Sequence, residues 1–119
     1  MTSKFTELSV DCRDPDTVAT FWSEVLGYEK KMEDDIVFLQ GPAGSGPTIA
    51  FVKVPEEKVV KNRLHIDVNP TDRDQQEEVE RLEKLGATHV DVGQGKVSWV
   101  VMADPEGNEF CVLRSRVST

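Results

Sequence analysis

The chain of 119 residues is poor in cysteine and contains no long apolar run. Its two cysteines, Cys12 and Cys111, are too few for a disulfide framework, so we predict that both are reduced thiols. No apolar stretch approaches the about 20 residues that span a bilayer. The first segment, MTSKFTELSV, lacks the apolar core of a signal peptide. We therefore expect a soluble, cytoplasmic protein with no membrane partner.

Basic residues are also in the minority. The chain has 14 Lys and Arg residues against 22 Asp and Glu residues, which gives a net charge of -8. This charge repels a phosphate backbone, so we do not expect nucleic acid as a partner. Hydrophobic residues make up 38% of the chain and charged residues 30%, which is typical of a globular protein with a packed core. The length fits one compact domain or two small repeats that share a core.

What the chain does contain is an internal repeat. Each half predicts a strand, then a helix, then three more strands. In the first half these elements are expected at residues 5–12, 15–26, 28–32, 36–40 and 48–54. In the second half they are expected at residues 65–69, 70–85, 88–92, 97–103 and 109–114. The repeat predicts an α+β fold made of two βαβββ modules.

Local signals set the helix ends. Asp14 is expected to cap the first helix, with Pro15 at its first position and Gly27 as its stop. Pro70, with Thr71 and Asp72 after it, is expected to open the second helix, which stops at Gly86. The apolar residues in each helix recur at helical spacing and form a single buried stripe. Trp22, on the first stripe, is therefore predicted to be a core residue.

The segment RLHIDV, residues 63–68, carries the first candidate site. Its aliphatic residues alternate with His65 and Asp67, as in a strand with one apolar face. We expect each helix to cover the aliphatic face of its sheet, formed by Leu8 and Val10 in one half and by Leu64, Ile66 and Val68 in the other. The opposite face is then left for Glu7, Ser9, Asp11, His65 and Asp67. Two such sheets side by side would curve around a shared cleft.

Four segments carry a resemblance to a known family. They are DPDTVATFWSEVLGY (14–28), KNRLHIDV (61–68), EVERLEKLGATHV (78–90) and WVVMADPEGNEFCVL (99–113). In order and spacing the chain resembles the vicinal oxygen chelate superfamily of glyoxalases, bleomycin resistance proteins and extradiol dioxygenases, and more narrowly the small glyoxalase-like domains. The resemblance implies one domain over residues 1–119, with modules at about 4–55 and 62–116 that form an incomplete barrel around a cleft. It also implies a homodimer, which would protect the open sheet edges.

The resemblance also implies where a metal would bind. In the superfamily, up to four ligands come from the first and last strands of the two modules. The matching positions here are Glu7, Phe51, His65 and Cys111, and alternation is expected to put Glu7, Phe51 and His65 opposite the aliphatic sets. The chain departs from the metalloenzyme pattern at two of them. Phe51 cannot ligate a metal, and Cys111 stands where a glutamate is usual.

Three interpretations of these residues stay open. In one, Glu7, His65 and Cys111 hold a divalent metal, with zinc the best match to an oxygen, nitrogen and sulfur set. In the second, no metal binds, and Glu7 pairs with His65, whose imidazole then moves a proton or binds a polar group of a ligand. In the third, the cleft has no function and His65 is a satisfied polar residue.

Several other residues are candidates for ligand binding. Phe38 and Phe51 are expected to make the cleft apolar and Trp99 to stack on a flat ligand. Asp67 is a further ligand-binding candidate, and the alternative is that it is a solvated strand residue. DPEGN (104–108) is interpreted as a tight turn and His89 as a surface residue. We predict a glyoxalase-like protein that binds a small organic molecule without a metal, as bleomycin resistance proteins do. The alternative is a lyase or isomerase that uses His65 and Glu7, with or without zinc.

Overall fold

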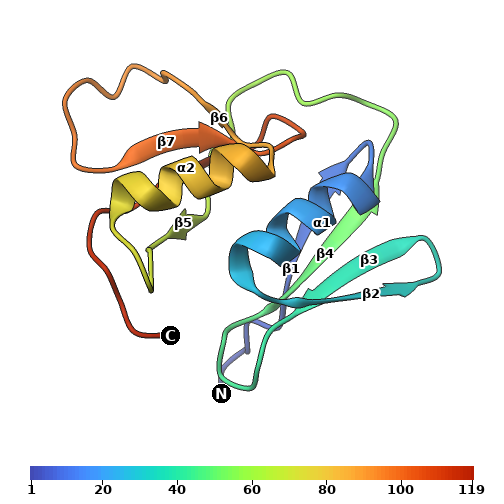
Figure 1. The fold of residues 1–119 in the computed structure, drawn as a ribbon. Coiled ribbons are helices and arrows are strands. Elements are labelled where there is room, and N and C mark those ends of the chain that lie inside the picture. Colours follow the sequence, from blue (N-terminus) through green and yellow to red (C-terminus); the bar gives the residue numbers. More distant parts are fainter. The chain divides into compact units, whose positions relative to one another are not determined.

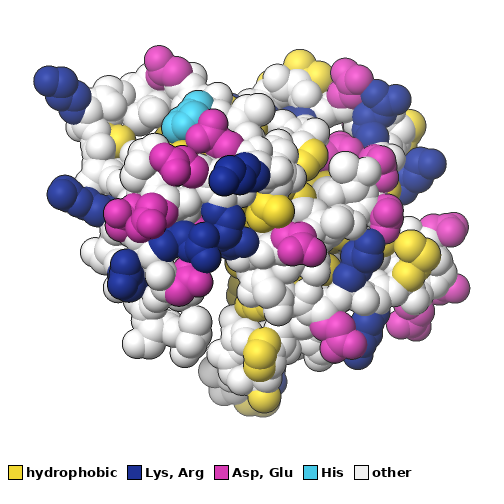
Figure 2. Space-filling model, in the orientation of Figure 1, with side chains coloured by type: hydrophobic (Ala, Val, Ile, Leu, Met, Phe, Trp, Pro, Cys, Tyr) yellow, Lys and Arg dark blue, Asp and Glu magenta, His cyan; other side chains and the backbone are white.

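The computed structural model describes residues 1–119, and the chain divides into two compact units, Met1–Glu57 and Lys58–Thr119. Each unit contains one strand, one helix and three further strands, in that order along the chain (Figure 1). The predicted α+β fold with two βαβββ repeats is confirmed. Neither helix has both the length and the apolar character that a membrane span requires. Acidic and basic side chains are interspersed over the surface in view (Figure 2).

The first unit is a four-stranded sheet with one helix. Its elements are β1 (Glu7–Cys12), α1 (Pro15–Leu26), β2 (Glu29–Glu33), β3 (Ile36–Gln40) and β4 (Thr48–Lys53). The strand order is β1-β4-β3-β2. β1 runs parallel to β4, and the other neighbours are antiparallel. These bounds lie within two residues of the predicted ones.

Helix α1 forms where its local signals place it. The Asp14 carboxylate accepts hydrogen bonds from the Thr17 backbone N–H (3.2 Å) and hydroxyl (2.7 Å), which caps the first turn. Gly27 ends the helix with a left-handed φ of 69°, a conformation that costs glycine little. Phe21 and Trp22 are both 3% exposed, and their rings meet edge to face at 5.3 Å. The prediction that Trp22 is a core residue is confirmed.

The strand register corrects one prediction about Phe51. Phe51 is the partner of Val10 on β1 and of Val37 on β3, so its side chain lies on the aliphatic face of the sheet. Residues of α1 contact β3 and β4, and Figure 1 shows the helix lying across this sheet. Phe51 is 1% exposed and is a core residue. Its predicted place opposite the aliphatic set, beside Glu7, is wrong, because Phe51 shares a face with Val10.

The second unit repeats this plan with shorter strands. Its elements are β5 (Asp67–Val68), α2 (Gln75–Leu85), β6 (Thr88–His89), β7 (Val100–Ala103) and β8 (Glu109–Val112). The order is β5-β8-β7-β6, with β5 parallel to β8. The strands are shorter than predicted, because regular pairing begins only at Asp67 in β5 and at Val100 in β7. Leu64 lies before β5 and is 84% exposed, so its predicted place under the helix is wrong.

Helix α2 begins later than the sequence suggested. Its cap is Asp74, whose carboxylate accepts a hydrogen bond from the Glu77 N–H (2.8 Å), while the Glu77 carboxylate accepts one from the Asp74 N–H (3.2 Å). This reciprocal pair is a capping box and satisfies two N–H groups of the first turn. The predicted start at Pro70 is therefore wrong by several residues. The predicted stop is confirmed, since Gly86 follows the last helical residue.

The predicted turn at DPEGN connects β7 to β8. The Asp104 carboxylate is buried and accepts hydrogen bonds from the backbone N–H groups of Glu106 and Asn108, both at 2.9 Å. The Asn108 side chain donates a third bond to it at 3.0 Å. The turn is therefore held by its own first residue, as is common for Asp in turns. It fixes where β8 starts, and with that the position of Cys111.

Candidate functional site

The second unit brings three chemically active side chains together. His65, Asp67 and Cys111 each offer one ligand or proton-exchanging atom, and these atoms lie within 4.8 Å of one another. His65 and Asp67 are exposed, whereas Cys111 is 7% exposed at the base of the cluster. Two of the three predicted metal residues, His65 and Cys111, therefore belong to one cluster.

Neighbouring strands hold two members of the cluster in register. Asp67 on β5 is the partner of Cys111 on β8, so the two side chains lie on the same face of the sheet. The Cys111 N–H donates to the Ile66 carbonyl at 3.0 Å, which continues this pairing toward His65. The alternate residue Val112 is fully buried and is the partner of Val68. The cluster is therefore on the sheet face opposite these aliphatic residues, as predicted for Cys111.

His65 and Asp67 form a direct pair. His65 Nδ1 lies 3.0 Å from Asp67 Oδ1, and the two side chains are 40% and 45% exposed. Residues two apart in an extended segment point to the same side, which brings the two groups together. With the carboxylate as acceptor, the proton of a neutral imidazole sits on Nδ1. Nε2 is then the atom with a free lone pair.

Cys111 is held in its protonated form. Burial raises the pKa of the thiol, and the negative charge of Asp67 and a hydrogen bond with its carboxylate raise the pKa further. The neutral S–H group is therefore a hydrogen-bond partner of Asp67 and is not a nucleophile near neutral pH. Asp67 is the central group of the cluster, because both His65 and Cys111 interact with it.

The remaining predicted residues belong to other segments of the chain. Glu7 is exposed on β1 in the first unit, so its predicted pairing with His65 stays a prediction. Phe38 is half-buried and pairs in register with Ala50, on the sheet face opposite Phe51. Trp99 precedes β7 and is 41% exposed, so its predicted role in stacking also stays a prediction.

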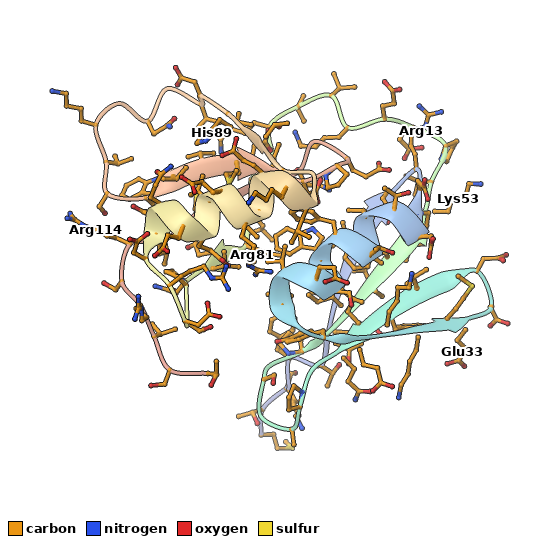
Figure 3. All side chains as sticks on the ribbon, in the orientation of Figure 1. Arg13, Glu33, Lys53, Arg81, His89 and Arg114 are labelled. Carbon is orange, nitrogen blue, oxygen red and sulfur yellow. The ribbon has the colours of Figure 1, made fainter.

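His89 and Asp67 show what sequence patterns could and could not indicate. His89 lies on β6 beside α2, where Nε2 is 3.6 Å from Glu83 Oε1, and its predicted surface position is confirmed (Figure 3). The sequence predicts Asp67 as a ligand-binding or solvated strand residue and does not predict its pairing with His65. The signal was present, since residues two apart on one strand share a face.

The cluster also has the donor set of a divalent metal site. Imidazole nitrogen, carboxylate oxygen and thiolate sulfur are all zinc ligands, and three protein ligands leave one position open for water or substrate. The residues therefore fit zinc in number and in type. Binding would require Cys111 to lose its proton, which its raised pKa opposes in the absence of metal.

Comparison with known proteins gives one family and several solved structures. Residues 7–113 match the model of the family described as glyoxalase-like domain. No curated protein sequence matches the chain.

Solved structures with a similar fold include the following three. The fosfomycin resistance protein FosX from Mesorhizobium loti has 17% identity and a TM-score of 0.71, over 98% of this chain and 95% of that one. A FosX variant from Listeria monocytogenes, in complex with Mn(II) and 1S,2S-dihydroxypropylphosphonic acid, has 16% identity and a TM-score of 0.70, over 98% and 93%. A glyoxalase/bleomycin resistance protein/dioxygenase family enzyme from Burkholderia phytofirmans PsJN has 20% identity and a TM-score of 0.64, over 92% and 97%.

Proposed function

Because this chain belongs to the family of glyoxalase-like domains, we propose that it binds a small organic molecule beside His65 and moves a proton of that molecule with His65 Nε2. The observation that carries the proposal is the 3.0 Å contact between His65 Nδ1 and Asp67 Oδ1. A carboxylate on Nδ1 holds the imidazole in one tautomer and one orientation, which leaves Nε2 directed at a ligand.

The proposed chemistry is proton transfer next to a carbonyl group. Nε2 takes a proton from the carbon beside the carbonyl, and the imidazolium that forms is stabilised by Asp67. Returning the proton to a neighbouring atom completes an isomerisation, and losing a leaving group instead completes a lyase reaction. Cys111 contributes by binding the Asp67 carboxylate, which keeps that group in place during the transfer. A positioned base of this type contributes about 10²–10⁴-fold to a rate.

Two types of ligand suit this chemistry and the family. Thiol adducts of 2-oxoaldehydes carry an acidic C–H bond next to a carbonyl group, which Nε2 would accept. Aromatic antibiotics would use the same site for binding without reaction, with Trp99 as the stacking surface.

A thermal-shift screen with both ligand types tests the proposal. A ligand at about 100 times its Kd stabilises the folded state by about 2.7 kcal/mol, which is a measurable rise in Tm. The chain offers a matched control, because it has two histidines and the other one, His89, is exposed on β6. We expect the shift to disappear in His65→Ala and to persist in His89→Ala. A shift that persists unchanged in both variants would contradict the proposal.

A metal-dependent form of the same activity is the second candidate. The donor atoms of His65, Asp67 and Cys111, within 4.8 Å of one another, favour it. These residues would hold zinc, which would supply Lewis-acid polarisation of a ligand oxygen. Element analysis of protein purified without a histidine tag separates the two candidates. Near-stoichiometric zinc that is lost in His65→Ala would favour the metal-dependent form and overturn the metal-free one.

We also propose that residues 1–119 act as one domain and that the protein is a cytoplasmic homodimer. Each four-stranded sheet is open, with β1 and β2 at the edges of one and β5 and β6 at the edges of the other. Open edges favour association, because they present unpaired backbone groups. Cys12 and Cys111 are both buried and neither forms a disulfide, which agrees with a reducing compartment. Light scattering coupled to size exclusion measures the mass directly, and a monomer at micromolar concentration would contradict the dimer.

A further inference from the structure

Glu109 makes a set of contacts that the proposed chemistry leaves unexplained. It is the first residue of β8, two positions before Cys111, so it lies on the same face of the sheet as Cys111 and Asp67. Its side chain is 13% exposed. A carboxylate that is so little exposed must be well paired, because an unpaired buried charge is costly.

Both carboxylate oxygens of Glu109 are used, and both hold the same segment. Oε2 accepts from Lys58 Nζ at 2.8 Å, and Oε1 accepts from the Asn62 backbone N–H at 2.9 Å. The Asn62 side chain adds a bond to Asn108, the residue before Glu109, at 3.4 Å. The segment 58–62 is therefore fastened to the start of β8 at two points.

This segment leads directly to His65. Asn62 is anchored to Glu109 on one side of the tripeptide 63–65, and the Ile66 carbonyl accepts from the Cys111 N–H on the other side at 3.0 Å. No regular strand pairing covers the tripeptide, since β5 begins at Asp67. The backbone position of His65 thus depends on two anchors, and both belong to β8.

The charges of Glu109 and Lys58 strengthen the contact between segment 58–62 and β8. Glu109 accepts from the charged Lys58 ammonium and from the Asn62 N–H at the same time, and hydrogen bonds to charged groups are shorter and stronger than neutral ones. Lys58 is also mostly buried, with 19% of its side chain exposed, so solvent screens this ion pair less than a surface pair.

We propose that Glu109 is a positioning residue: by holding Lys58 and Asn62 it fixes the segment before β5 and thereby sets where His65 lies relative to Cys111. The proposal rests on the proposed function only in taking His65 as the functional group. In metal sites, removing a group that orients a ligating imidazole typically lowers metal affinity or activity by about 10–100-fold, which gives the scale of such effects.

The test is made on the ligand-free full-length protein, so its result is separate from the success or failure of any ligand. The variant is Glu109→Ala, and the matched control is Glu78→Ala. Glu78 is an equally buried carboxylate in the same unit, with 8% of its side chain exposed, and Arg81 holds it through two bonds of 2.8 and 3.0 Å on α2 (Figure 3). Both variants lose a buried charge pair, but only Glu109→Ala loses the anchor.

Two readouts follow the position of His65. The first is hydrogen exchange of the Cys111 amide, which is protected by the Ile66 carbonyl. The second is the rate at which diethyl pyrocarbonate modifies His65, with His89 in the same molecule as the internal reference. We expect both rates to rise about tenfold in Glu109→Ala and to stay within about twofold in Glu78→Ala when the two are compared at equal stability. Equal rates in the two variants would overturn the proposal.

A second variant keeps the test usable if Glu109→Ala does not fold. Asn62→Pro removes the backbone N–H that donates to Glu109, together with the Asn62 side chain, and Asn62→Ala is the control for the lost side chain. Glu109→Gln is the conservative variant, since its amide oxygen can still accept from the Asn62 N–H. We expect Asn62→Pro to raise both the exchange rate of the Cys111 amide and the modification rate of His65. We expect Glu109→Gln to keep most of the protection that Glu109→Ala loses. Faster rates in Asn62→Ala than in Asn62→Pro would overturn the proposal.

Discussion

Replacing Phe51 by alanine tests the corrected strand register and the division between core and site. Phe51 is 1% exposed and lies in register with Val10 and Val37 on the aliphatic face of its sheet. Truncating a fully buried phenylalanine costs about 3–5 kcal/mol, from lost burial and from the cavity that remains. For a domain of this size, 1 kcal/mol corresponds to about 3–6 °C in Tm, so we expect Tm to fall by about 10–25 °C.

The assay is urea unfolding followed by circular dichroism, with Phe38→Ala as the control. Phe38 is half-buried on the opposite face, so we expect its truncation to cost about 1–2 kcal/mol. If Phe51 lined a ligand site instead, its loss would reduce ligand binding and change the free energy of unfolding little. A loss below about 1.5 kcal/mol in Phe51→Ala, or a larger loss in Phe38→Ala, would refute the register.

Three further predictions concern single contacts. Asp67→Asn removes a charge that raises the pKa of Cys111, so we expect iodoacetamide to label Cys111 several-fold faster at about pH 8, and an unchanged rate would contradict the contact. The pKa of Glu109 is lowered in the folded state, so the ionised carboxylate stabilises the fold fully above the unfolded pKa of about 4.5, and this stabilisation is lost as pH falls through the folded pKa. The difference in free energy of unfolding between the wild type and Glu109→Gln should therefore shrink on acidification. A difference that stays constant with pH would contradict this. Asp74→Ala should lower the free energy of unfolding by about 1 kcal/mol and Asp72→Ala by less, measured by urea unfolding, and the reverse order would contradict the observed start of α2.

The first unit could be predicted closely from local sequence signals. Asp14, Pro15 and Gly27 fix the ends of α1 through contacts within a few residues, which a sequence shows directly. The start of α2 could not be chosen in the same way. The sequence analysis predicts the opening at Pro70, whereas the capping box of Asp74 with Glu77 sets the start of α2 because it satisfies two backbone donors at once.

Alternation in the sequence predicts the sheet face of a side chain only where the strand is regularly paired. In β8, Cys111 alternates with Phe110 and Val112 as expected. Leu64 fits the same alternation in the sequence, but β5 pairs with β8 only from Asp67 onward, so the pattern does not apply to it. The extent of pairing depends on a partner strand more than forty residues away in the chain, which local patterns do not specify.

The sequence predicts two members of the cluster of His65, Asp67 and Cys111. His65 and Cys111 were predicted from the family resemblance, and the second unit brings them together. The face of Phe51 could not be deduced, because it depends on the register between β1 and β4. The spacing of Asp67 from His65 indicates that both side chains lie on one side of an extended segment, but spacing alone does not show that they pair.

The most direct test of the central claim is the tautomer of His65 in the free protein. Nitrogen NMR of the neutral imidazole ring distinguishes a proton on Nδ1 from one on Nε2. With Asp67 Oδ1 at 3.0 Å, we predict that the proton lies on Nδ1 and that Asp67→Asn abolishes this preference. A proton on Nε2 in the wild-type protein would contradict the account, because the atom proposed to accept a proton would already carry one.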